Sequence, residues 1–151
     1  MNFEELMLRA VTNAETFKYT AKPNPVVGAI LCNDNEIISE GYHEIYGSNH
    51  AEINAISNAR KHQGKKFNNF SELALVCTLE PCSHVGKTGS CAEQIVETGI
   101  KKVVIGSIDP NPKVAGKGIE ILKKNGIDVT VGIHEDIVKK QNKYFFFKHT
   151  N

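Results

Sequence analysis

The segment that decides the fold is residues 73–99, which read LALVCTLEPCSHVGKTGSCAEQIVETG. Its apolar run Leu73–Thr78 predicts a buried strand, and Ala92–Thr98 has the spacing of a short helix. Between them lies a polar, glycine-rich loop that carries two cysteines. A strand followed by a helix is the first half of a unit in which the helix crosses to a parallel neighbouring strand. The segment therefore predicts an α/β protein.

The flanking sequence continues the alternation of strands and helices. Downstream, apolar runs predict two further strands, each followed by a segment with helical spacing. Upstream, the turn-forming cluster Asn33-Asp34-Asn35 separates two apolar runs and predicts a β-hairpin. The expected elements are a helix over 3–18, hairpin strands Val26–Cys32 and Glu36–Gly41, a helix His50–Lys61, a strand Lys102–Ser107, a helix Val114–Lys124, a strand Ile127–Val131 and a final helix from about Glu135.

These elements predict a single sheet. Strands joined by helical crossovers of this length lie parallel, so we expect a five-stranded mixed sheet, a hairpin followed by a βαβαβ unit, with helices on both faces. Ligands bind such sheets at the carboxyl ends of the strands. The polar segments Glu80–Cys91 and Asp109–Pro112 each follow a strand. We therefore expect the functional site at that end of the sheet.

Length and composition limit the class of protein. The chain has 151 residues, of which 40% are hydrophobic and 23% charged, and its formal net charge is +1. One domain over residues 1–151 is expected, because a second full-sized domain does not fit. A charge near zero provides no broad basic surface, so we expect no nucleic-acid partner. Apolar stretches far shorter than about 20 residues and an acidic N-terminus predict a cytoplasmic protein with no membrane contact.

The four cysteines divide into two pairs. Cys32 and Cys77 lie within expected strands and are predicted to be core thiols. Cys82 and Cys91 flank a polar loop, which is a poor place to bury an apolar thiol. Thiolates combined with an imidazole select zinc over hard cations, and three protein ligands leave a fourth position for water. The second pair therefore predicts a zinc site.

The motif His50-Ala51-Glu52 supplies an imidazole and a carboxylate at a helix start. Alone, it is also the pattern of a surface helix whose glutamate faces the positive end of the helix dipole. With the two loop cysteines it gives the His/Cys/Cys set of zinc-dependent nucleobase deaminases, in which the glutamate moves protons. His84 is an alternative imidazole ligand, because Cys82-Ser83-His84 has metal-like spacing, although that choice leaves Glu52 without a neighbouring metal.

The loop between these cysteines is longer than in the deaminase signature. Eight residues, Ser83–Ser90, separate them, whereas the signature has two. The first cysteine would then bind metal from the end of a strand and the second from the start of the next helix. The inserted residues include His84, Lys87 and Thr88, which offer a ring donor, a cation and a hydroxyl. Together they predict an anchor for a polar, phosphorylated substrate.

Four blocks of the sequence carry a resemblance to a known family. They are Asn24-Pro25-Val26-Val27-Gly28, His50-Ala51-Glu52, the residues Thr78 to Thr88, and Asp109-Pro110-Asn111-Pro112 with Gly116-Lys117-Gly118. In this order they resemble the diaminohydroxyphosphoribosylaminopyrimidine deaminases of bacterial riboflavin biosynthesis, and the resemblance runs from about residue 5 to residue 147. The chain departs from that family by carrying Gly89-Ser90 where relatives usually carry prolines.

The resemblance implies a cytidine-deaminase-like, three-layer α/β fold and a hydrolase that removes an amino group from a pyrimidine. It implies one zinc ion per chain, bound by His50, Cys82 and Cys91, with Glu52 as the proton shuttle. It also implies that the residues around the substrate are Asn24, His43, His84, Lys87, Asp109 and Asn111.

The resemblance also carries expectations about partners. Most bacterial relatives continue into a reductase domain, and this chain stops where that domain would begin. We therefore expect a separate or fused reductase to carry out the next step, and no NADPH on this chain. The expected ligand is a small phosphorylated pyrimidine. A homo-oligomer is expected as well, since deaminases of this fold commonly associate.

Two other interpretations stay open at this point. The first is a deaminase of cytidine, a cytidylate or a transfer-RNA base, which would share the fold; the eight-residue spacing and the low net charge argue against it. The second is a non-catalytic zinc-binding module, which predicts that Glu52 is dispensable. On the residues alone, Asn24-Pro25 is also an ordinary turn and Asp109–Pro112 a rigid connector.

Overall fold

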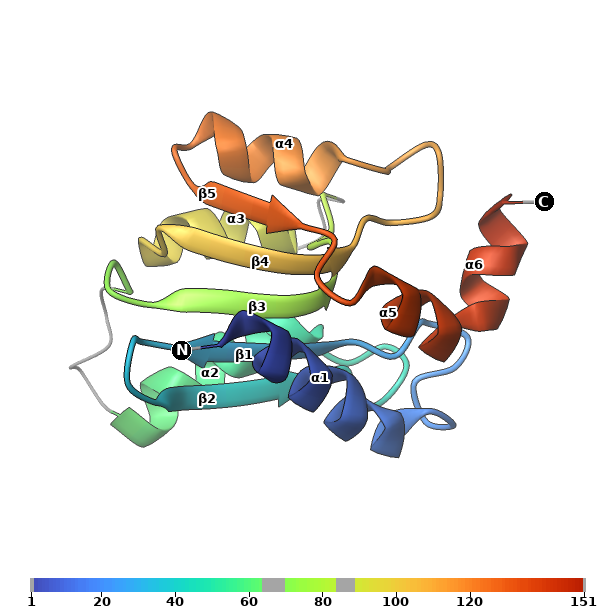
Figure 1. Ribbon diagram of the computed structural model, residues 1–151, viewed down its shortest axis with the longest axis horizontal. Coiled ribbons are helices and arrows are strands. Elements are labelled where there is room, and N and C mark those ends of the chain that lie inside the picture. Colours follow the sequence, from blue (N-terminus) through green and yellow to red (C-terminus); the bar gives the residue numbers. More distant parts are fainter. Residues whose placement is uncertain (1, 64–69, 84–88, 151) are drawn as a thin grey trace.

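The computed structural model describes residues 2–63, 70–83 and 89–150, which form a five-stranded sheet in the order β2-β1-β3-β4-β5 (Figure 1). The strands are β1 (Gly28–Cys32), β2 (Ile37–Tyr42), β3 (Ala74–Leu79), β4 (Lys102–Ser107) and β5 (Asp128–Val131). β1 pairs antiparallel with β2 and β3, whereas β3, β4 and β5 run parallel. This arrangement confirms the expected hairpin followed by a βαβαβ unit.

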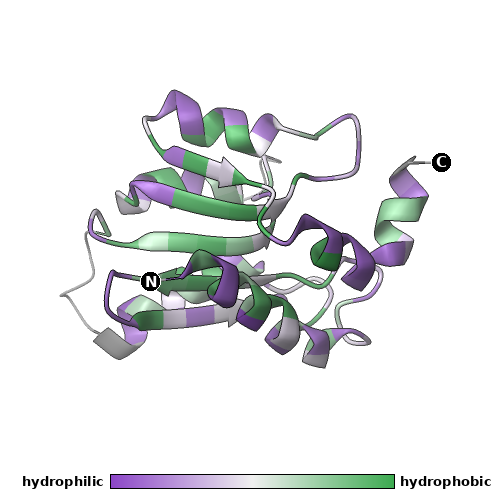
Figure 2. Cartoon of the chain, in the orientation of Figure 1, coloured by the Kyte–Doolittle hydropathy of each residue, from purple (hydrophilic) through white to green (hydrophobic). Residues whose placement is uncertain are grey.

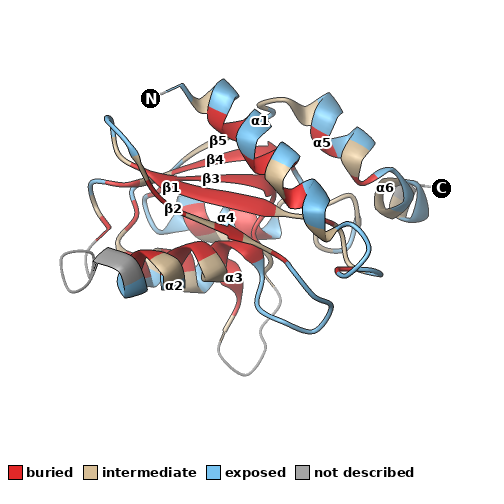
Figure 3. Cartoon of the chain, turned by 90° about the horizontal axis from the view of Figure 1, so that it is seen from below, coloured by how far each residue is buried: buried red, intermediate tan, exposed pale blue. Residues whose placement is uncertain are grey.

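Helices cover both faces of the sheet. They are α1 (Phe3–Ala14), the 3-10 turn η1 (Glu15–Phe17), α2 (Ala51–Gln63), α3 (Cys91–Thr98), α4 (Lys117–Lys124), α5 (Glu135–Gln141) and α6 (Lys143–Thr150). α1 and α5 lie on one face and α2, α3 and α4 on the other, which makes the three layers seen in Figure 3. Among the helices of the described residues, none combines the length and apolar character that crossing a membrane requires.

The core consists of two apolar layers, one on each face of the sheet. Alternate residues of β1 belong to different layers: Leu31 packs with α2 and α3, whereas Ile30 packs with α1. Because both faces are covered, every residue of β1 is buried. Figure 2 shows the apolar residues concentrated along the central strands. Cys32 and Cys77 are buried in these layers, so the prediction of two core thiols is confirmed.

The C-terminal segment differs from the single helix expected from about Glu135. It forms two helices that separate at Asn142, whose backbone leaves helical values (φ −109°, ψ 38°). The side chain of Asn142 brackets the backbone of Val26, accepting from its N–H at 2.8 Å and donating to its carbonyl at 3.0 Å. These two contacts tie the helix break to the strand entrance, and α6 starts in a new direction.

The helix expected from Val114 begins later, at Lys117. The preceding residues form a turn in which the carbonyl of Asn111 accepts from the N–H groups of Val114 and Ala115. Gly116 follows with a φ of 82°, a left-handed conformation that favours glycine. The turn and this glycine therefore set the start of α4.

Candidate functional site

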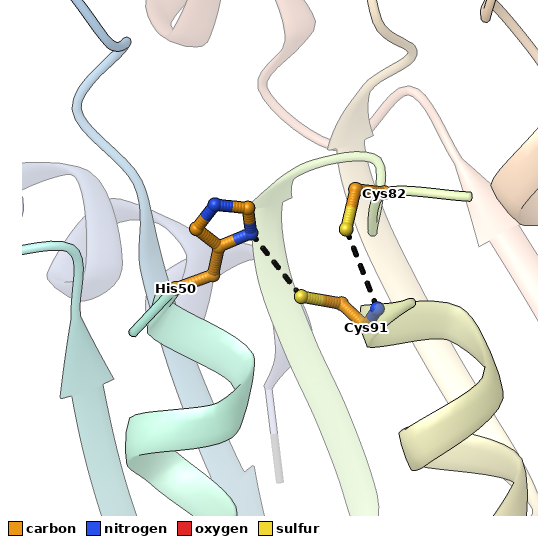
Figure 4. A group of neighbouring side chains, drawn as sticks. All are labelled: His50, Cys82 and Cys91. Atoms are coloured by element: carbon orange, nitrogen blue, oxygen red, sulfur yellow. Dashed lines mark hydrogen bonds between the residues drawn. The ribbon is translucent and has the colours of Figure 1, made fainter. Parts of the chain in front are cut away.

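Three side chains with metal-binding atoms meet at one end of the sheet (Figure 4). His50 precedes α2, Cys82 follows β3, and Cys91 is the first residue of α3. Their ligand atoms all lie within 4.8 Å of one another, and Nδ1 of His50 is 3.2 Å from Sγ of Cys91. The structure therefore brings together the three residues that the sequence singled out as zinc ligands. The alternative ligand His84 lies outside the described residues.

The spacing and chemistry of these three side chains fit zinc. Tetrahedral zinc holds sulfur and nitrogen ligands roughly 3.5–3.8 Å apart, so this group needs only small adjustments. The backbone N–H of Cys91 donates to Sγ of Cys82 at 3.3 Å. Hydrogen bonding from the Cys91 thiol lowers the pKa of Cys82, while the same contact raises the pKa of Cys91. The pair thus already stabilises one thiolate, the form that binds metal.

Gly89 and Ser90, which stand where relatives usually carry prolines, help to position Cys91. Ser90 is the N-cap of α3, and its Oγ accepts from the N–H of Glu93 at 3.1 Å. A serine N-cap stabilises a helix start by roughly 1 kcal/mol. Gly89 precedes it with a φ of 89°, where a proline could not stand. Cys91 is therefore held at a capped helix end.

Glu52 is a buried carboxyl group beside the three ligand-type residues. It lies in the first turn of α2, two residues after His50, and the residue is 3% exposed. Burial raises its pKa to about 7, although the nearby His50 opposes this. Its carboxylate also contacts the thiol of Cys91. A carboxyl group in these surroundings can both hold and release a proton near neutral pH.

His50, Glu52 and Cys82 line a cavity of about 200 Å³. Polar groups make up one part of the lining and apolar side chains the rest. The lining residues are Asn24, Pro25, Val27, His43, His50, Glu52, Leu79, Glu80, Cys82, Asp109 and Phe145. A largely apolar pocket with a few convergent polar groups is typical of a small-molecule site.

Asn24 and His43 form a fixed pair in this cavity. Nδ1 of His43 lies 3.1 Å from the carbonyl of Asn49, which assigns the ring proton to Nδ1. Nε2 is then the acceptor for the amide N–H of Asn24 at 3.1 Å. Burial lowers the pKa of His43, which is 2% exposed, and so favours the neutral ring. The contact leaves the amide oxygen of Asn24 able to accept from a ligand.

The remaining predicted substrate contacts differ in whether the structure places them in the cavity. Asp109 lines the cavity at the end of β4, and burial raises its pKa. Asn111 is not among the described lining residues; its Oδ1 accepts from the N–H of Lys113 at 3.0 Å within the turn. His84 and Lys87 lie outside the described residues, so the structure does not place them.

Glu80 is a lining residue whose role the sequence did not reveal. The residue is 8% exposed, and its carboxylate accepts hydrogen bonds from the backbone N–H groups of Gly116, Gly118 and Ile119 at 2.9–3.1 Å. Gly118 is required there, because a Cβ atom would lie 1.9 Å from the carbonyl of Pro81. Glu80 therefore fixes the start of α4 against the end of β3. The motif contained this residue, but only the fold shows which N–H groups face it.

Phe145 is the second lining residue whose position the sequence did not reveal. The run Tyr144–Phe147 predicts a helix that packs on the sheet or on a partner. In the structure Tyr144 and Phe147 are 84% and 65% exposed, Phe146 packs beside the core, and Phe145 lines the cavity. Which ring faces the cavity depends on the helix break before it, and no local pattern in the sequence announces that break.

Most of the chain is similar to known proteins. The family model for the zinc-binding region of cytidine and deoxycytidylate deaminases matches residues 1–107, a range that includes His50, Glu52, Cys82 and Cys91. A protein of Buchnera aphidicola subsp. Schizaphis graminum named diaminohydroxyphosphoribosylamino-pyrimidine deaminase is 44% identical over 140 residues. That alignment covers 93% of this chain and 90% of the relative.

Solved structures agree. The Thermotoga maritima diaminohydroxyphosphoribosylaminopyrimidine deaminase/5-amino-6-(5-phosphoribosylamino)uracil reductase is 44% identical with a TM-score of 0.89, over 98% of this chain and 41% of that one. This chain thus spans well under half of that relative. The Aspergillus oryzae Rib2 deaminase, solved in complex with DARIPP, is 22% identical with a TM-score of 0.72 over 97% of both chains, and so shares the fold.

Proposed function

Because the chain belongs to the cytidine and deoxycytidylate deaminase family and, within it, to the diaminohydroxyphosphoribosylaminopyrimidine deaminases, we propose that it deaminates diaminohydroxyphosphoribosylaminopyrimidine in riboflavin biosynthesis. The products are 5-amino-6-(5-phosphoribosylamino)uracil and ammonia. The observation that carries the proposal is the His50, Cys82 and Cys91 group with the buried carboxyl of Glu52 beside it, opening into one cavity.

His50, Cys82 and Cys91 are the residues that would hold one zinc ion per chain. When bound, zinc lowers the pKa of water to roughly 7 and so supplies a nucleophile at neutral pH. The chain's own contribution is a set of ligands fixed by three different elements. Ser90 caps the helix that carries Cys91, and the end of β3 carries Cys82.

Glu52 is the proposed proton carrier. Deamination forms a carbon–oxygen bond at a ring carbon and breaks the carbon–nitrogen bond to the leaving amine. Glu52 accepts a proton from the attacking water, delivers one to the ring nitrogen, and later protonates the amine so that it leaves as ammonia. Its burial supports this role, because a carboxyl with a raised pKa can carry the proton between these steps.

The substrate is proposed to lie between the polar groups of the cavity. Asn24, held by His43, offers its amide oxygen to an amino group of the pyrimidine, and Asp109 offers a carboxylate to a sugar hydroxyl. His84, Lys87 and Asn111 complete the proposed contacts, with Lys87 as the cation for the phosphate. The first two of these lie outside the described residues.

Several wider features belong to the same proposal. The catalytic unit is one domain over residues 1–151, acting in the cytoplasm as a homo-oligomer, with no nucleic-acid or membrane partner. It needs no NADPH for its own reaction, because hydrolysis transfers no hydride. A reductase, separate or fused, consumes the product.

Ammonia release from a panel of substrates tests the function. The zinc-loaded chain is expected to release ammonia from diaminohydroxyphosphoribosylaminopyrimidine without NADPH and to leave cytidine, deoxycytidylate and transfer RNA unchanged. Turnover confined to the cytidine-type compounds would replace the proposed substrate. Zinc binding without turnover of any of them would favour a non-catalytic zinc module.

A further inference from the structure

The last helix of the described chain contributes a side chain to the catalytic cavity. α6 lies at the end of the sheet where β4 and β5 terminate (Figure 1). Phe145 lines the same cavity as Asn24 and Glu52, although the three residues are far apart in the sequence. Its ring is the only phenyl group among the described lining residues. A residue outside every recognised motif therefore forms part of the site.

The position of Phe145 is set by the helix break at Asn142. Asn142 is 5% exposed, and its amide makes the two contacts to the backbone of Val26 described above. Its carbonyl accepts from the N–H of Phe146 at 3.0 Å, in the first turn of α6. Val26 itself directly follows Asn24-Pro25, two lining residues. Asn142 thus joins α6 to the segment that carries two other lining residues of the cavity.

Neighbouring rings on α6 then fix which way Phe145 points. Phe146 packs against the apolar cluster of Val11, Leu79 and Val138. Successive residues of a helix point about 100° apart, so Phe146 in this cluster directs Phe145 elsewhere, toward the cavity. One turn later, the ring of His149 meets Phe145 edge-on, with centroids 4.8 Å apart and planes at 69°. The ring of Phe146 also meets Phe145 edge-on, with centroids 6.3 Å apart and planes at 82°, so two rings of the same helix contact Phe145.

The proposed reaction requires the cavity to orient the substrate ring. A nucleophile attacks a pyrimidine perpendicular to the plane of its ring. The pyrimidine must therefore be held with one face toward Glu52 and the zinc ligands. The apolar part of the lining consists of Pro25, Val27, Leu79 and Phe145. Of these four side chains, Phe145 alone carries an aromatic ring. Stacking between an aromatic side chain and a base contributes substantially to binding.

We propose that Phe145 is a specificity-determining residue whose ring contacts the face of the substrate pyrimidine, and that Asn142 is the residue that positions it. The inference rests on the proposed function, since it takes the ligand to be a flat heteroaromatic ring.

Steady-state kinetics and direct binding test the inference on the full, zinc-loaded chain. Phe145→Ala is expected to raise KM by about 10-fold to 100-fold, with a smaller change in kcat. Phe145→Tyr should keep KM within about 3-fold of the parent, and Phe145→Leu should resemble Phe145→Ala. Tyr144→Ala, which removes an exposed ring from the same helix, is the matched control and should leave both constants unchanged.

Substrate binding measured without turnover separates the contribution of the Phe145 ring to binding from any contribution to the catalytic steps. In a Glu52→Gln background, the Kd for the same substrate by calorimetry should rise with Phe145→Ala by the same factor as KM. Asn142→Ala should raise KM in the parent but add little to Phe145→Ala, because it acts through that ring. Additive effects of the two substitutions would assign Asn142 a separate structural role.

The outcomes distinguish a failure of the proposed ring contact from a failure of the proposed function. If the parent chain deaminates the substrate and Phe145→Ala keeps its KM, the ring contact is wrong and the function stands. If Phe145→Leu restores the KM of the parent, apolar volume rather than a π face matters, and the proposal is overturned. If the parent chain does not turn over this substrate, the proposed function itself is wrong.

Discussion

Oε1 of Glu80 accepts a hydrogen bond from the backbone N–H of Asp109 at 3.0 Å, so the residue just after β3 directly holds a residue of the loop that follows β4. The same oxygen accepts from Gly116, and Oε2 accepts from Gly118 and Ile119. One buried carboxylate therefore fixes both the turn that carries Asp109 into the cavity and the start of α4.

Glu80→Gln is expected to destabilise the protein. Glutamine keeps one acceptor oxygen and places an NH2 group against N–H donors, which removes charge-assisted hydrogen bonds that each contribute about 1.5–3 kcal/mol. We expect the Tm to fall by roughly 5–10 °C and the KM to rise, with zinc content unchanged. Glu72→Gln, at an exposed position, is the control in thermal denaturation. A Glu80→Gln chain with the parent Tm would show that the four contacts are weak.

Glu52→Gln is expected to keep zinc and lose activity. Glutamine has nearly the shape of glutamate but cannot carry the proton, and such proton transfer contributes about 10²-fold to 10⁴-fold to a rate. Metal analysis should give about one zinc per chain in both proteins, while kcat falls by that factor. Glu120→Gln, on the exposed side of α4, should keep the parent kcat. Near-normal turnover by Glu52→Gln would remove the proton-carrier role.

Zinc is expected to stabilise the fold through Cys91. An ion that binds only the native state raises stability by RT ln(1 + [L]/Kd), about 2.7 kcal/mol when free zinc is 100 times the Kd. Adding zinc to the chelator-treated chain should therefore raise its Tm. Cys91→Ala should abolish the increase, and Cys32→Ala, which alters a buried thiol in the core, should retain it. An equal increase in both variants would require a different ligand set.

The pair of Arg9 and Glu40 is expected to make stability depend on acid pH. Nε and Nη2 of Arg9 donate to the two carboxylate oxygens of Glu40 at 2.8 and 2.9 Å, and this hydrogen bonding lowers the pKa of Glu40. A carboxyl with a lower pKa in the folded state stabilises that state above its unfolded pKa of about 4.3, and the contribution is lost as the pH falls through the folded pKa.

Glu40→Gln should therefore lose Tm at neutral pH and approach the parent in acid. Thermal denaturation from pH 7 to pH 3 measures this convergence, with Glu36→Gln, an exposed carboxyl at the hairpin turn, as the control. The effect should be modest, because half of the Arg9 side chain is exposed to solvent. A constant difference between Glu40→Gln and the parent at all these pH values would contradict the assignment.

The fold and the metal-binding group follow from local sequence to a large extent. Strands such as Lys102–Ser107 are short apolar runs between turn signals, and the structure has this strand with the same bounds. His50, Glu52, Cys82 and Cys91 lie in motifs whose spacing carries the chemistry, so they could be found without the fold. Their location at one end of the sheet is expected, because ligands bind such sheets at the carboxyl ends of the strands.

The residues that sequence reasoning missed depend on contacts between distant segments. Glu80 accepts from N–H groups that lie about 30 to 40 residues further along the chain. Phe145 lies in a helix that begins after the break at Asn142. The substrate contact of Asn111 stays a prediction. In the structure its Oδ1 accepts from an N–H within its own turn, a local contact that the motif alone does not reveal.

The bond between Asn142 and Val26 also has a consequence for synthesis of the chain. Cys91, the last of the three ligand residues, is made about fifty residues before Asn142. Domains form progressively as the chain leaves the ribosome at roughly 5–20 residues per second. The nascent chain therefore holds every residue of the metal-binding group for some seconds before α6 is made, so the lining residue Phe145 joins the cavity after the metal ligands have been synthesised.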